Sequence, residues 1–181
     1  LLKHQGYNVK TGQVLNGICV THEIDVLAEK ANEVIIAECK FHNLHGLSCD
    51  VKIPLYIHSR FNDVKNFLLK DKKNQLNNYI GWVVTNTKFT SDAIQYGECA
   101  GLHLVGWNFP LNGSIKDMVD SSGLYPLTCL STLTNREKKI LLEQRFVLCI
   151  DILHKPDILN LVELTPARVE NVMREVRSLI N

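Results

Sequence analysis

The sequence lacks any long hydrophobic run, any C-x-x-C pair and any large excess of charge of one sign. No stretch approaches the ~18 consecutive apolar residues of a transmembrane helix, so we expect no membrane span. The start also lacks the charged segment and apolar stretch of a signal peptide. The 20 Lys and Arg residues against 19 Asp and Glu residues exclude a wholly basic surface. Any nucleic-acid site must therefore be a local patch.

Signals for paired cysteines are absent too. Five of the six cysteines lie among apolar neighbours or in expected helices and strands, as suits free thiols in a reducing cytosol, so we predict a cytoplasmic protein. The six are Cys19, Cys39, Cys49, Cys99, Cys129 and Cys149. His42, His45 and Cys49 have a spacing typical of zinc ligands, but no fourth ligand accompanies them. A polar loop is the favoured interpretation.

The composition is that of a globular protein. With 45% apolar and 22% charged residues, the 181-residue chain can bury a core, and intrinsic disorder is excluded. At about 150 residues per domain, the length indicates one full domain, or one domain with a small appendage. The Gly-, Asn- and Pro-bearing stretch 106–113 predicts a boundary between a domain of residues 1–112 and a helical region of residues 113–181. Because the chain begins at Leu1 without methionine, we expect it to be part of a longer protein.

Strand and helix patterns alternate through the first domain, which is typical of an α/β architecture. We expect a helix end at 1–5 that Gly6 terminates, a strand at 7–11, a loop at 12–17, a hairpin of 22–28 with 34–41, a helix from about 51 to 68, a buried strand at 79–85, a helix at 91–98 and a strand at 102–107. In the longer helix, residues from Leu55 to Leu68 recur at spacings of three and four, which predicts one buried face that includes His58.

Only helical patterns follow the boundary. Thr134 and Glu137 form a capping box that predicts a helix to about Ile152, and Thr165-Pro166 begins another that runs toward residue 179. This helical tail, especially residues 164–173, resembles helix-hairpin-helix DNA-binding modules. Those modules hold a phosphate on a glycine-bearing hairpin. No glycine occurs after Gly123. A structural or docking appendage is therefore favoured over DNA binding.

The expected hairpin sets two carboxylates against each other. If Glu29 pairs with Val34, then Asp25 lies opposite Glu38 on the same face of the sheet. Directly opposed carboxylates repel, and a divalent cation between them would remove that cost. A slip of one residue would put the two on opposite faces, so this prediction depends on the register.

Lys40 completes the pattern. In the same register Lys40 lies opposite Glu23 on the face of the two carboxylates, and Ile24 and Val26 lie on the other face as core residues. Oxygen ligands with an adjacent ammonium group suit magnesium-assisted hydrolysis of phosphodiesters. There the lysine orients the attacking water or stabilises the charge that develops on the phosphate. The ordinary alternative for an E-x-K strand is a solvated face with a salt bridge.

Four short motifs occur in order along residues 1–110: Gly6-Tyr7, Ile24-Asp25, Glu38-Cys39-Lys40, and the segment 83–90 followed by Ala93. Their order and spacing resemble the Mrr-like restriction endonucleases of the PD-(D/E)xK nuclease superfamily. In that family a G-Y strand leads to an I-D motif, a Q/E-x-K strand follows, and a buried strand ends in T-x-x-F-T-x-x-A. The resemblance implies a restriction-endonuclease-like mixed β-sheet flanked by helices, followed here by the small all-α C-terminal appendage.

The resemblance also implies roles for individual residues. Asp25 and Glu38 become the ligands of Mg²⁺ (or Mn²⁺), and Lys40 becomes the catalytic lysine. The family's glycine-rich lead into the I-D motif is replaced here by His22-Glu23, so Glu23 is either an accessory ligand or, as we favour, a partner of Lys40. Some relatives add an acidic ligand from the first helix, which is largely absent from this chain.

We therefore predict a magnesium-dependent DNA endonuclease of the Mrr-like restriction type. The alternatives are a non-catalytic DNA-binding or regulatory module that keeps the fold, and a nuclease resembling Holliday-junction resolvases. Weaker candidates for contacts with the DNA backbone are Arg60, Lys65, Lys72 and Lys73. Besides DNA, a second copy of the chain and an upstream domain stay open as partners, and we expect no membrane partner.

Overall fold

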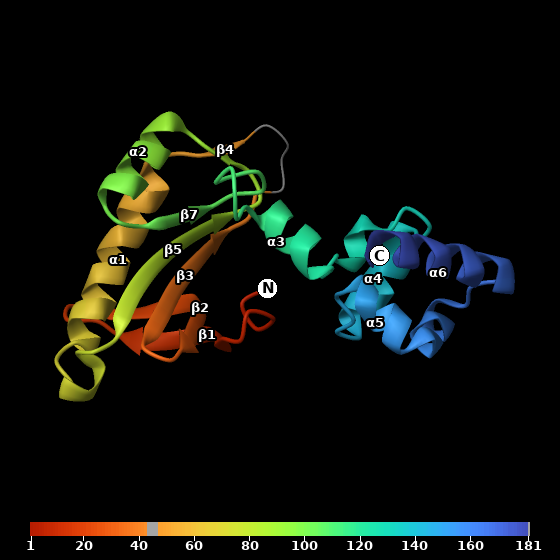
Figure 1. Ribbon diagram of the computed structural model, residues 1–181, viewed down its shortest axis with the longest axis horizontal. Helices are drawn as coiled ribbons and strands as arrows, with labels where there is room; N and C mark the ends of the chain where they lie inside the picture. Colours follow the sequence, from red (N-terminus) through yellow and green to blue (C-terminus); the bar gives the residue numbers. More distant parts are fainter. Residues whose placement is uncertain (43–46, 181) are drawn as a thin grey trace. The chain divides into compact units, whose positions relative to one another are not determined.

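The structure is a computed structural model that describes residues 1–42 and 47–180. The chain divides into two compact units, Leu1–Met118 and Val119–Asn181 (Figure 1). The boundary falls inside helix α3, Ile115–Ser122, a few residues after the boundary expected at 112. No helix of the described residues is both long enough and apolar enough to cross a membrane.

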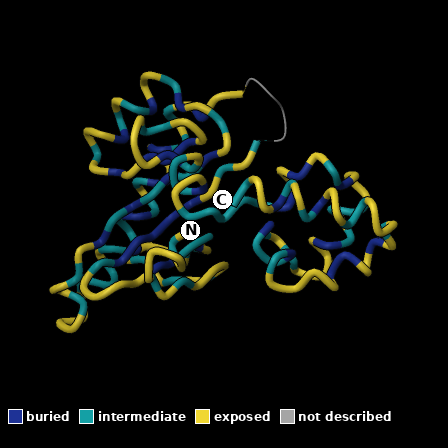
Figure 2. The backbone as a smooth tube through the Cα atoms, turned by 45° about the vertical axis from the view of Figure 1, so that its right-hand side comes forward, coloured by how far each residue is buried: buried dark blue, intermediate teal, exposed yellow. Residues whose placement is uncertain are grey.

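A mixed sheet of five strands forms the centre of the N-terminal unit, which confirms the α/β architecture. Its order is β1-β2-β3-β5-β7, with β1, β2 and β3 antiparallel and β3, β5 and β7 parallel. The strands are β1 Asn8–Asn16, β2 Thr21–Lys30, β3 Glu33–Lys40, β5 Asn78–Thr85 and β7 His103–Val105. In β3 the residues 34–38 are all buried (dark blue in Figure 2), because β3 pairs on both edges and carries packed side chains on both faces.

Two helices contribute to the larger core cluster of this unit. Helix α1, Lys52–Leu68, buries Ile57, Phe61 and Val64 in this cluster, and α2, Ser91–Cys99, adds Ala93. Leu55, expected on the buried face of α1, is 43% exposed, because the face is centred on Ile57 and Phe61 instead. A separate small parallel pair joins β4, Ser48–Cys49, with β6, Lys88–Phe89.

Two local predictions near the N-terminus were wrong. Residues 2–6 form turns rather than the end of a helix, although Gly6 has the left-handed conformation that was expected there, with φ +88°. The expected loop at 12–17 belongs mostly to β1, which continues to Asn16 because it pairs with β2 along its length. Short-range sequence signals did not show this pairing, since the partner strand lies beyond the turn.

The C-terminal unit is entirely helical. Its elements are η2 Leu127–Cys129, α4 Asn135–Glu143, α5 Cys149–His154, η3 Pro156–Val162 and α6 Pro166–Ile180. The helix expected to run from Thr134 to about Ile152 is wrong in its extent. It ends after Glu143, where Arg145 adopts φ +65° and the amide of Phe146 donates to the carbonyl of Leu141. A separate apolar core holds the unit together, with Leu130, Leu141, Ile152, Val172 and Val176 among its buried residues.

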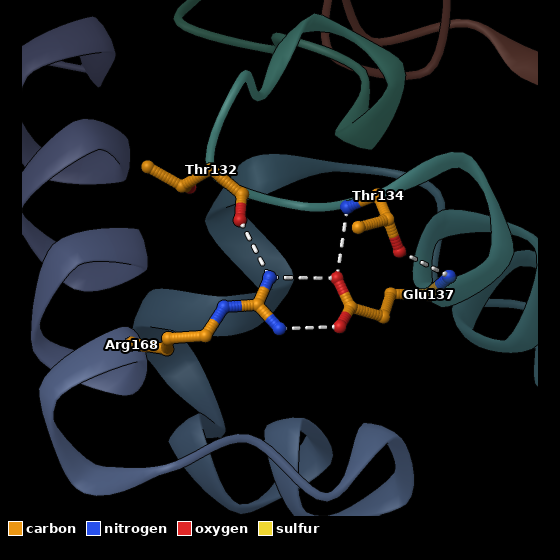
Figure 3. A network of polar contacts seen from close by, with 4 residues as sticks. All are labelled: Thr132, Thr134, Glu137 and Arg168. Atoms are coloured by element: carbon orange, nitrogen blue, oxygen red, sulfur yellow. Dashed lines mark hydrogen bonds and ion pairs between the residues drawn. The ribbon is translucent and has the colours of Figure 1, made fainter.

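A network of polar contacts joins the capping box of α4 to α6 (Figure 3). Thr134 accepts from the amide of Glu137, and the Glu137 carboxylate accepts from the amide of Thr134, as the sequence predicts. Arg168 of α6 donates to both oxygens of Glu137, at 2.6 and 2.9 Å, and to the carbonyl of Thr132 at 3.0 Å. These contacts lower the pKa of Glu137 to about 2, and the hydrogen bond from Arg168 has the largest effect.

This lowered pKa predicts a loss of stability in acid. The stabilisation from a carboxylate with a lowered pKa is complete above its unfolded value, about 4.3, and is lost as the pH falls toward 2. We expect Glu137→Gln to destabilise the C-terminal unit by about 1.5–3 kcal/mol at pH 7, since charged hydrogen bonds are lost. Melting followed by circular dichroism from pH 7 to pH 3 should show a constant difference between wild type and variant down to about pH 5 and a decreasing difference below it.

Glu143→Gln is the matched control for this comparison. Glu143 lies 3.9 Å from Lys139 in an exposed i,i+4 pair, and such pairs contribute only about 0.3–0.5 kcal/mol. A Glu137→Gln protein as stable as Glu143→Gln at pH 7 would contradict the role of the Arg168 network.

Candidate functional site

The candidate site lies where strands β2 and β3 stop pairing. Glu29 pairs with Val34, so the register expected from the sequence is confirmed. The pairing runs from Lys30 with Glu33 to Val26 with Ala37 and does not continue to the next pair of residues. Asp25 and Glu38 are that next pair, so the two carboxylates sit at the open end of the hairpin.

Asp25 uses its side chain where backbone pairing ends. Its Oδ2 accepts a hydrogen bond from the amide of Cys39 at 2.7 Å. On its other edge, β1 pairs with β2 on both sides of Asp25 but not opposite it, where Gly12 has φ +59°. A glycine tolerates this left-handed conformation, and the irregularity changes which face the neighbouring side chains occupy.

The expected alternation of faces is therefore wrong around Asp25. Ile24 belongs to the same core cluster as Leu27 and helix α1, whereas Val26 packs against the cluster on the opposite face. Strict alternation would have put Ile24 and Val26 together. The physical reason is the irregular backbone at Gly12 and Asp25, which resets the alternation in both strands at once.

Glu38 is the buried carboxylate of the site, with 4% of its surface exposed. The Arg60 guanidinium of α1 forms an ion pair with Glu38 Oε1, although that buried oxygen has no hydrogen-bond partner among the described residues. Burial, with a hydrogen bond to Asp25 and the charge of Asp25, raises the pKa of Glu38 to about 7 against the lowering effect of Arg60 and Lys40. The structure thus brings together the two predicted ligands and the predicted lysine.

Lys40 lies at the end of β3 and is half-buried. Its charge is close enough to lower the pKa of Glu38. The same charge opposes the rise that burial causes in the pKa of the Cys49 thiol. The backbone of Lys40 is fixed by Thr85, whose buried Oγ1 donates to the Lys40 carbonyl at 2.8 Å. Asn86 then makes two hydrogen bonds of 2.9 Å with the backbone of His42. The last residue of β5 and the residue after it therefore position the end of the strand that carries Glu38 and Lys40.

Glu23 is not placed as expected. Its side chain is exposed, and no described contact joins its carboxylate to Asp25, Glu38 or Lys40. The expected pairing with Lys40 does not form, because β2 and β3 separate before reaching these residues. Glu23 contributes its backbone carbonyl instead, which accepts a hydrogen bond from Arg60.

The basic residues proposed for DNA contact have different environments. Arg60 is held inside the site, with 13% of its side chain exposed. Lys65 places its ammonium 5.6 Å from the centre of the Phe61 ring. Lys72 and Lys73 are exposed in η1, Lys72–Asn74, which follows the C-terminal end of α1. Only Arg60 among these four contacts a candidate site residue in the described structure.

A further partly buried contact, that of the α1 carboxylate Asp63 with His22, was missed from the sequence. Asp63 accepts from His22 Nε2 at 2.8 Å and from the amides of Cys19 and Val20. His22, with these amides and a contact from the Cys19 thiol, lowers the pKa of Asp63 to about 2 despite some desolvation. Gly17 is required here, since a Cβ would lie 2.0 Å from Asp63 Oδ2. The available signal was the three-residue spacing of Arg60 and Asp63, which puts both on one side of α1.

Other metal and anion sites receive little support. In the described ranges, no group of three or more His, Cys, Asp or Glu side chains is arranged to hold a metal. Of the zinc-like spacing, His45 lies outside the described residues, and Cys49 is buried. In the C-terminal unit, the amides and hydroxyls of Ser131 and Thr132 hold the carboxylate of Glu175. The loop at Ser131 and Thr132 therefore binds an internal carboxylate rather than offering its amides to a phosphate.

Comparison with known proteins identifies relatives along the whole chain. The family model described as AF1548-like, C-terminal, matches residues 125–180. An uncharacterized protein of Archaeoglobus fulgidus is 33% identical over 184 residues, which cover 99% of this chain and 98% of that protein. A solved structure titled as the crystal structure of the protein of unknown function AF1548 is 31% identical, with a TM-score of 0.72, over 99% of this chain and 92% of that chain.

Proposed function

The chain belongs to the AF1548-like family, and we propose that it is a metal-dependent DNA endonuclease whose N-terminal unit has a restriction-endonuclease-like fold. One observation carries the proposal. The buried carboxylate of Glu38 lies beside Asp25 at the open end of a hairpin, with Lys40 two residues further along the same strand. The order of motifs that resembles the Mrr-like PD-(D/E)xK nucleases supports this interpretation.

The residues present fit a hard divalent cation. Glu38 Oε1 is a buried oxygen that contacts the Arg60 guanidinium but accepts no hydrogen bond from the described residues, and it shares the site with a second carboxylate. Mg²⁺ is commonly held by one or two carboxylates with waters completing its shell, so two protein ligands are enough. Asp25 and Glu38 would hold Mg²⁺ or Mn²⁺, which would supply Lewis-acid chemistry for phosphodiester hydrolysis when bound.

The other side chains have defined tasks in this proposal. The Lys40 ammonium stabilises the negative charge that develops on the phosphate during attack by water. Thr85 holds the Lys40 backbone, and Asp25 holds the amide of Cys39 between the two key residues of β3. These contacts fix the spacing of carboxylate and ammonium, which such electrostatic catalysis requires.

A cleavage assay tests the proposal. The protein is incubated with Mg²⁺ or Mn²⁺ and with duplex, single-stranded and branched DNA, and the products are separated by electrophoresis. We expect metal-dependent cuts in at least one substrate and none with EDTA. Preference for branched DNA would assign the protein a resolvase-like activity. DNA binding without any cut would contradict the proposal.

One observation favours a second function, a DNA-binding or regulatory module without catalysis. Arg60 already supplies a positive charge against Glu38, so the fold does not depend on a metal to neutralise that carboxylate. A protein that binds DNA equally well with Mg²⁺ or EDTA, and cuts none of the three substrates, would have this function.

A further inference from the structure

Arg60 bridges the gap between the two strands of the candidate site. One nitrogen of its guanidinium contacts Glu38 of β3, and another donates to the carbonyl of Glu23 of β2. The same group lies 5.2 Å from the centre of the Tyr56 ring. The side chains of Arg60 and Glu38 are only 13% and 6% exposed. Arg60 therefore links β2 and β3 at the point where the two strands stop pairing.

Arg60 and a divalent cation would need the same oxygen. The guanidinium contacts Glu38 Oε1, which is the buried oxygen best suited to a metal in this site. Two cations at one carboxylate repel each other strongly when water is largely excluded. Metal binding at Asp25 and Glu38 is therefore opposed as long as Arg60 keeps its place.

A phosphodiester is a suitable alternative partner for Arg60. A guanidinium binds phosphate oxygens in a bidentate manner, and it gives up water more readily than an ammonium group. Tyr56, against which Arg60 lies, is 52% exposed, so this side of the site faces solvent. A DNA backbone that approaches from the side of Tyr56 would therefore reach the Arg60 guanidinium next to its contact with Glu38.

We propose that Arg60 couples metal binding to DNA binding: without DNA it holds Glu38, and a backbone phosphate draws it away and leaves Glu38 to the cation. This inference rests on the proposed function, and it gives the nuclease a means of regulation. Such coupling is reciprocal, so the metal must raise DNA affinity by the same factor that DNA raises metal affinity.

Calorimetric titration with Ca²⁺, a cation that prefers oxygen ligands, measures this coupling. Ca²⁺ is titrated into the full chain with and without the tightest-binding of the three DNA substrates, and electrophoresis checks that the DNA stays intact. We expect DNA to raise the Ca²⁺ affinity of wild type about 5-fold or more, within the usual range of couplings. In Arg60→Ala, we expect tight Ca²⁺ binding without DNA and a change of less than about twofold when DNA is added.

Two further variants make the comparison decisive. Arg60→Gln keeps an N–H donor at this position without the charge, and it replaces Arg60→Ala in the comparison if the alanine variant folds poorly. Lys52→Ala removes another cation of α1, one that is exposed in the first turn of the helix, and it should keep the wild-type coupling. Circular dichroism confirms that each variant is folded.

The outcomes separate this inference from the proposed function. If Arg60→Ala and Arg60→Gln weaken Ca²⁺ binding or keep the wild-type response to DNA, the coupling role of Arg60 is wrong. If in that case Asp25→Asn still abolishes Ca²⁺ binding, the metal site stands without the coupling. If Asp25→Asn binds Ca²⁺ like wild type, the metal site itself is wrong and both proposals fail.

Discussion

Lys40→Ala should slow DNA cleavage by on the order of a hundredfold or more while DNA binding changes little. The variant keeps both carboxylates of the site, and the Lys40 backbone stays fixed by the hydrogen bond from Thr85. Only the ammonium is lost, and its contribution belongs to the transition state, where negative charge increases on the phosphate. A group that acts mainly in the transition state changes the rate far more than it changes binding.

The measurement compares single-turnover cleavage rates and DNA dissociation constants for the same preparations. Lys10→Ala is a matched control, since Lys10 is an exposed lysine of β1 that makes no described contact with either carboxylate. We expect the control to cut at the wild-type rate. A Lys40→Ala protein that cuts as fast as Lys10→Ala would overturn the assignment of the catalytic lysine.

Asp25→Asn should abolish the stabilisation of the N-terminal unit by Mg²⁺ or Mn²⁺. A ligand that binds only the folded state raises stability by mass action, by about 2.7 kcal/mol at a concentration of 100 times its Kd. The asparagine can still accept the hydrogen bond from the Cys39 amide that Asp25 accepts at 2.7 Å, so the fold should persist. It loses the negative charge that a hard cation requires.

Thermal melting followed by tryptophan fluorescence measures this effect, because both tryptophans, Trp82 and Trp107, belong to the N-terminal unit. Asp71→Asn is the matched control. Asp71 also accepts from a backbone amide, that of Lys73 at 3.0 Å, but it caps η1 outside the site. We expect the control to keep the full metal-induced rise in Tm. An equal rise in Asp25→Asn would show that the ion binds elsewhere.

Local patterns in the sequence determined several elements and their register. The β-rich runs on either side of a short polar turn predicted the β2–β3 hairpin and the pairing of Glu29 with Val34. The spacing around Phe61 predicted α1, and the apolar run before Thr85 predicted β5. Thr134 and Glu137 predicted their own capping box. These features depend on neighbours within a few residues, so the sequence alone contains the relevant contacts.

Only the tertiary structure decided how the candidate carboxylates are surrounded. Arg60 reaches Glu38 because α1 packs across the sheet, and no spacing along the chain reports that distance. Ile24 packs with α1 because the backbone at Gly12 and Asp25 is irregular, and the strand pattern gave no sign of it. Glu23 separates from Lys40 because β2 and β3 diverge at this point. Charge, burial and pairing at the site arise from segments far apart in the chain, so they follow from packing rather than from local sequence.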